Sequence, residues 1–67
     1  MFEIDPEMAA KIRERRARKR LTLQQSAEEI GISRMTLGSI ESGKRTRVYR
    51  NVYEKLVNWL VNEKVVN

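Results

Sequence analysis

The chain has 67 residues, of which 14 are Lys or Arg and 9 are Asp or Glu, so its formal net charge is +5. It contains neither cysteine nor histidine, which excludes a disulfide framework, thiolate or imidazole metal sites, and the usual general base at neutral pH. We therefore expect one domain, residues 1–67, with no metal, no cofactor and no catalytic residue. The surplus of positive charge favours a polyanionic partner.

The location of the protein is constrained by what the sequence lacks. No apolar run approaches the roughly 18 residues that a membrane span requires. The opening sequence MFEIDPEMAA does not have the basic-then-apolar order of a signal peptide. The absence of cysteine suits a reducing compartment. We expect a cytoplasmic protein with no membrane partner.

The first predicted helix begins at the only proline of the chain. Asp5 is suited to cap this helix, and Pro6 is suited to its first position. Residues 11–20 include seven bases and a single acid, Glu14, so we expect most of this charge to lie in solvent. Such charge attracts a polyanion at long range without reading its sequence. The residues expected to act only in this way are Arg13, Arg15 and Lys19.

Two short helices with a tight break between them follow. The sequence TLQQ, which starts at Thr22, is a capping box that begins the first of them. Gly31 is suited to end that helix in a left-handed conformation. Ser33 caps the next helix, which extends to about Ser42. Together these signals predict a helix-turn-helix over about residues 22–42.

The second of these helices has two distinct faces. Leu37 and Ile40 are three residues apart and share a face that can pack against the preceding helix. The opposite face carries Arg34, Met35, Gly38, Ser39 and Ser42. Gly38 costs about 1 kcal/mol relative to alanine inside a helix, which indicates close approach to a partner. A helix with such a face fits the major groove of B-DNA, although Met35 could instead fill the core.

The sequence IRERRARKRLTLQQSAEEIGISRMTLGSIESGKR resembles the lambda-repressor-like (Cro/repressor-type, xenobiotic-response-element) helix-turn-helix family. The matching positions are Arg16, Leu21, Thr22, Ala27, Gly31, Ile32, Ser33, Leu37, Ile40, Glu41, Gly43 and Lys44. The resemblance implies an all-α, compact bundle of four to five helices. It also implies binding to double-stranded DNA as a dimer on paired half-sites.

The resemblance assigns roles to individual residues. It implies DNA base contacts from Arg34, Met35, Gly38 and Ser39. It implies DNA phosphate contacts from Leu23, Gln24, Ser33, Lys44, Arg45 and Arg47. It further implies a structural ion pair between Arg16 and Glu41.

Two residues depart from the family pattern. Ser26 stands where the family prefers leucine, so a core contact is either missing or supplied by another residue. Arg20 stands where glycine is common, and a left-handed backbone there would cost roughly 1 kcal/mol.

A last helix is predicted over about residues 48–64. Tyr49, Val52, Tyr53, Leu56 and Leu60 recur at steps of three and four, the pattern of a half-buried helix. At this spacing Tyr49, Tyr53 and Trp59 are expected in the core rather than stacked on bases. Further valines at positions 57, 61, 65 and 66 exceed what a small core can absorb and predict a protein interface. No strand pattern is present.

These observations favour a sequence-specific, double-stranded DNA-binding transcriptional regulator, a repressor that reads the major groove with residues 34–42. We expect a homodimer through the C-terminal helix. The alternative is an antitoxin-type or other interaction module whose C-terminal helix binds a protein partner. A third reading makes KIRERRARKR an arginine-rich helix for RNA or a membrane surface. An enzyme is not expected, because no nucleophile–base pair or metal cluster can be assembled.

Overall fold

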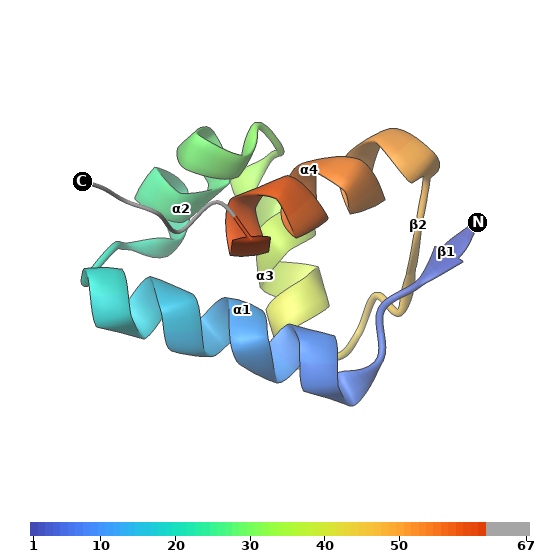
Figure 1. Ribbon diagram of the computed structural model, residues 1–67, viewed down its shortest axis with the longest axis horizontal. Coiled ribbons are helices and arrows are strands. Elements are labelled where there is room, and N and C mark those ends of the chain that lie inside the picture. Colours follow the sequence, from blue (N-terminus) through green and yellow to red (C-terminus); the bar gives the residue numbers. More distant parts are fainter. Residues whose placement is uncertain (62–67) are drawn as a thin grey trace.

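The computed structural model describes residues 1–61 (Figure 1). The elements in chain order are β1 (Phe2–Glu3), α1 (Pro6–Lys19), α2 (Leu23–Ile30), α3 (Arg34–Ser42), β2 (Arg47–Val48) and α4 (Arg50–Val61). Figure 1 shows α1 lying along one side of the molecule. Helices α3 and α4 pack against it, and α2 packs against α3 and α4. The predicted all-α bundle is confirmed. None of the helices in this part of the chain is long and apolar enough to cross a lipid bilayer.

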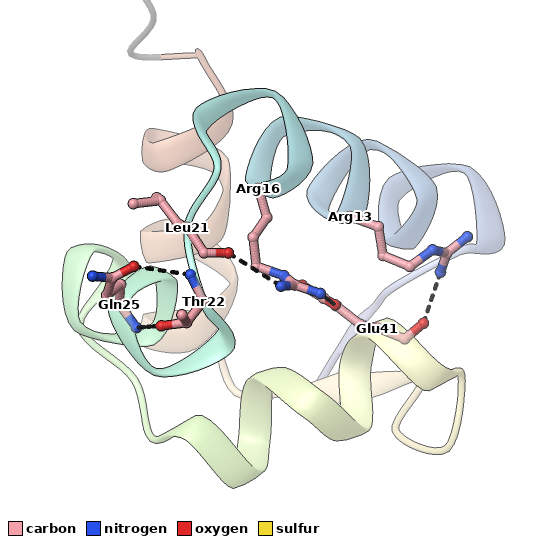
Figure 2. Close-up of polar contacts among 6 residues, drawn as sticks. All are labelled: Arg13, Arg16, Leu21, Thr22, Gln25 and Glu41. Atoms are coloured by element: carbon pink, nitrogen blue, oxygen red, sulfur yellow. Dashed lines mark hydrogen bonds and ion pairs between the residues drawn. The ribbon is translucent and has the colours of Figure 1, made fainter.

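The helices begin where local capping signals place them. Asp5 Oδ1 accepts a hydrogen bond of 2.8 Å from an amide in the first turn of α1. The capping box of α2 is complete, since the Gln25 amide donates to Thr22 Oγ1 at 3.0 Å and the Thr22 amide donates to Gln25 Oε1 at 2.9 Å (Figure 2). Ser33 Oγ accepts from the Thr36 amide at 3.0 Å at the start of α3. All three predicted helix starts are confirmed.

The first three helices each end in a left-handed residue. The φ angles are 57° at Arg20, 96° at Gly31 and 86° at Gly43. Glycine adopts this conformation readily, whereas an L side chain is strained in it. Arg20 is the one non-glycine residue with positive φ among residues 1–61. The strain expected from the departure at this position is therefore present.

The two short strands are a feature that the sequence did not predict. Strands β1 and β2 pair antiparallel, with Phe2 opposite Val48, and the Ile4 amide donates to the Thr46 carbonyl at 2.7 Å. Because the backbone at Val48 is extended in this pairing, α4 begins at Arg50, two residues after the start predicted near residue 48. The predicted extension of this helix to residue 64 lies outside the described residues.

The core is built from the four helices, from β2, and from Ile4 in the connection between β1 and α1. Its buried apolar side chains are Ile4, Ala9, Ile12, Ala27, Ile30, Leu37, Ile40, Val48, Leu56 and Trp59. Leu37 and Ile40 are completely buried, as the two-faced pattern of α3 predicted. Ser26 is also completely buried, and its hydroxyl has no hydrogen-bond partner among residues 1–61. The position that the family fills with leucine therefore holds a desolvated hydroxyl in this chain.

The aromatic residues of the C-terminal helix do not all lie in the core. Trp59 is buried as predicted, and Tyr53 is half-buried and stacks on Phe2 with ring centroids 5.0 Å apart. The core prediction for Tyr49 is wrong, because its side chain is 70% exposed. Tyr49 precedes α4 and is therefore outside the periodic face of that helix.

Candidate nucleic-acid interface

Helix α3 presents one face to solvent. Met35 is 82% exposed and Arg34 is also exposed, whereas Leu37 on the other side of the helix is completely buried. Gly38 and Ser39 are half-buried on the exposed side. The interpretation of Met35 as a core filler is therefore wrong. The face predicted to read bases is available to a partner.

A shallow depression of about 300 Å³ brings many of the predicted DNA contacts together. It is lined by Leu23, Arg34, Met35, Gly38, Ser39, Ser42 and Lys44. These residues come from the start of α2, from the length of α3 and from the loop that follows it. All four predicted base contacts and two of the predicted phosphate contacts lie on this one surface.

Gly38 allows another side chain to approach the backbone of α3. A Cβ atom at this position would lie 3.3 Å from Leu23 Cδ2, closer than comfortable packing permits. The Leu23 side chain therefore occupies space that any larger residue at position 38 would contest. Leu23 is predicted as a phosphate contact, but its side chain packs against α3 at Gly38.

The starts of α2 and α3 are suited to phosphate. The first amides of a helix have no partner within the helix, and its dipole places positive charge there. The side chains at these sites are already engaged: Gln24 Nε2 donates to Glu28 Oε2 at 2.9 Å, and Ser33 Oγ donates to Thr36 Oγ1 at 2.8 Å. Any phosphate contact from Gln24 would thus come most directly from its backbone amide.

The basic residues after α3 do not lie together in the fold. Lys44 lines the depression on α3, whereas Arg45 lines a separate hollow beside α1 and Arg47 lies in β2. The loop is held in place by the Arg45 amide, which donates to the Ser39 carbonyl at 3.0 Å. Of the three bases, Lys44 is the one that the fold places with the predicted base contacts.

A bidentate ion pair sets the position of α3 (Figure 2). Arg16 donates through Nε and Nη2 to the two carboxylate oxygens of Glu41, each at 2.9 Å, and Nη1 donates to the Leu21 carbonyl at 3.2 Å. The hydrogen bond from Glu41 raises the pKa of Arg16, against the opposing effect of burial. Arg13 Nη1 also donates to the Glu41 carbonyl at 2.7 Å. Helix α1 thereby holds the last turn of α3.

Three bases of α1 have structural contacts that the sequence did not indicate. Besides the contact of Arg13, the Arg15 guanidinium lies 5.3 Å from the Trp59 ring centroid, and Lys19 Nζ lies 3.3 Å from Glu29 Oε1. Trp59 Nε1 donates to the same Glu29 oxygen at 3.0 Å. This hydrogen bond and the one from Lys19 lower the pKa of Glu29, while burial opposes them. The prediction that these bases act only at long range is wrong.

The capped helices α2 and α3 meet at the turn around Gly31. One face of α3 is buried in the core, and the opposite face is exposed to solvent. This arrangement defines a helix-turn-helix module. Residues 7–60 match a family model described as a helix-turn-helix domain. The chain belongs to this helix-turn-helix family, and the match agrees with the lambda-repressor-like resemblance. Comparisons with curated proteins and with solved structures gave no match. Membership of this family indicates a DNA-binding regulator.

Proposed function

We propose that the protein is a sequence-specific regulator of transcription that binds double-stranded DNA and represses by occupying its site. On this proposal it is a binding protein of the cytoplasm and has no enzymatic role. The observation that carries the proposal is the open face of α3, where exposed Arg34 and Met35 lie beside Gly38 while the opposite face is sealed in the core. A helix presented in this way can enter the major groove.

The residues of the depression divide into those that contact bases and those that contact phosphates. Arg34 carries a planar fork that matches O6 and N7 of guanine, a contact worth about 1–3 kcal/mol of discrimination. Ser39 lies on the same face and can donate to a base edge. Lys44 contacts phosphate together with the amides at the start of α2, and such contacts make the affinity depend steeply on salt.

A second surface supports a homodimer. A hollow of about 520 Å³ lies between α1 and α4. Its apolar lining is Met8, Val57, Leu60 and Val61, and its charged lining is Asp5, Glu7, Lys11, Glu14, Arg15 and Arg18. Because both signs of charge are present, two copies related by a two-fold axis can pair opposite charges across it. A dimer would place two copies of α3 about 34 Å apart on successive major grooves.

The same hollow favours the alternative function. Val61 is 71% exposed on α4, and an apolar helix of a different protein could cover it as well as a second copy. In that case the protein is an antitoxin-type interaction module. Sedimentation of the isolated protein distinguishes the two. A dimer that Val61→Asp converts to monomer, while Asn51→Asp at an exposed site on α4 does not, supports the homodimer. A monomer at all concentrations favours the alternative.

The DNA-binding proposal is tested by selecting bound duplexes from a random pool at moderate salt. We expect a palindromic consensus. Arg34→Ala should relax the preference at one base position in each half-site, whereas Lys44→Ala should weaken binding to all sequences alike. The proposal fails if no consensus emerges, and the assigned face is wrong if both variants bind like the parent.

A further inference from the structure

Two apolar side chains line a surface that is otherwise polar and basic. Leu23 reaches the α3 depression from α2, and Met35 projects into solvent from α3 itself. Met35 is 82% exposed, more than any other large apolar side chain in residues 1–61. A methionine so exposed gains nothing from the core, so its apolar surface is available to a ligand.

Gly38 lies in the same depression as these two side chains, and we call the part lined by Leu23, Met35 and Gly38 the notch. A Cβ at this position would lie 3.3 Å from Leu23 Cδ2, so the absence of a side chain is what lets leucine lie against the helix backbone. The notch therefore presents apolar side chains within a depression of about 300 Å³. Gly38 thus has a role beyond close approach, because alanine would displace Leu23 or fill the notch.

The surroundings of the notch indicate what it binds. Arg34 and Lys44 line the same depression and give it positive charge, which matches a polyanion rather than an apolar peptide. Within the major groove of DNA, the apolar group that a base edge presents is the 5-methyl group of thymine. The apolar side chains of the notch are complementary to this methyl group, and the flanking Arg34 and Lys44 are complementary to the negative charge of DNA.

We propose that Leu23 and Met35, which line the α3 depression together with Gly38, bind the methyl group of a thymine in each half-site. Because Arg34 and Met35 line the same depression, we expect this thymine close to the base that Arg34 contacts. The inference rests on the proposed function, since it names one feature of the DNA that the same surface recognises.

The experiment uses the selected duplex with each thymine replaced in turn by uracil, which removes only the methyl group. Dissociation constants are measured by fluorescence anisotropy at one salt concentration. One thymine per half-site should show a three- to five-fold loss of affinity on replacement, the effect expected for one buried methyl group. At that position 5-methylcytosine should bind more tightly than cytosine.

Protein variants connect this effect to the notch. Met35→Gln keeps the length of the side chain on an exposed site and should reduce the thymine-to-uracil ratio toward one. Leu23→Ala should do the same, provided that circular dichroism shows it folded. Lys44→Ala is the matched control, because it should weaken both duplexes while preserving their ratio.

The outcomes separate this inference from the proposed function. If no consensus sequence can be selected, the DNA-binding function itself fails. If a consensus is found but every thymine tolerates uracil, the methyl-binding notch is refuted while the DNA-binding function stands. A ratio that persists in Met35→Gln and in folded Leu23→Ala also overturns the assignment.

Discussion

Glu41→Ala should lower the free energy of unfolding by about 2–3 kcal/mol. The substitution removes the carboxylate that accepts two hydrogen bonds of 2.9 Å from Arg16 and leaves the guanidinium without its partner. Breaking a buried pair costs about 3–5 kcal/mol. The lower figure applies because the Arg16 side chain is 29% exposed and retains its bond to the Leu21 carbonyl.

A loss of this size is large for so small a domain. At about 0.05–0.15 kcal/mol per residue the whole chain is stabilised by only about 3–10 kcal/mol. At about 4–8 °C per kcal/mol, Tm should fall by roughly 10–20 °C. Trp59, the one tryptophan of the chain, is buried and provides a fluorescence signal for thermal unfolding.

The matched control is an exposed polar pair outside the hollow between α1 and α4. Gln24 Nε2 donates to Glu28 Oε2 at 2.9 Å and both residues are exposed, so Glu28→Ala should change stability by less than about 0.5 kcal/mol. The reasoning is refuted if Glu41→Ala unfolds within 0.5 kcal/mol of the parent, or if the two variants lose the same stability.

Three further predictions concern stability. Ser26→Ala should raise the free energy of unfolding by about 0.5–1 kcal/mol, because it removes a buried hydroxyl that lacks a partner in residues 1–61 and improves helix propensity. A loss of stability in urea unfolding would mean that this hydroxyl has a hydrogen-bond partner. Arg20→Gly should raise Tm by about 4–8 °C, since it relieves roughly 1 kcal/mol of backbone strain in the left-handed conformation at φ 57°. The control is Arg20→Ala, which keeps this strain and should show no rise in Tm in a calorimetric scan. The third prediction concerns pH. Because the pKa of Glu29 is lower in the folded protein than its ordinary value of 4.5, its contribution to stability is present above that value and is lost as the pH falls through the folded value. Glu29→Gln should therefore flatten the acid limb of a stability–pH curve below about pH 4.5, and an unchanged slope would contradict the role of the Trp59–Lys19–Glu29 contacts.

Local signals in the sequence were sufficient to place most of the helices. Asp5, Thr22 and Ser33 each accept a hydrogen bond from an amide three residues further along the chain, and Gly31 and Gly43 end helices. The residues that set each of these helix ends are therefore close to it in the sequence. The exposed face of α3 followed from helical spacing for the same reason. The ion pair between α1 and α3 came from the family resemblance, because spacing within one helix cannot reveal a partner on another.

Features that depend on distant partners escaped prediction. A two-residue strand is too short to show an alternating pattern, and its pairing with β2 joins the beginning of the chain to residues 47–48. That pairing also moved the start of α4 and left Tyr49 outside the core. The contact between Arg15 and Trp59 crosses from α1 to α4. From the sequence alone, basic residues on a helix are expected in solvent, because the aromatic ring or carboxylate that they contact lies on another helix.

The small sheet also has a consequence for how the protein is made. Phe2 has its strand partner at Val48 and its stacking partner at Tyr53, so residues near position 2 can be fixed only after residues 48–53 have been synthesised. Until then the segment after α3 is held at Arg45, whose amide donates to the Ser39 carbonyl, but not at Val48. A nascent chain that ends before Val48 therefore lacks the strand pairing that fixes the far end of the basic loop.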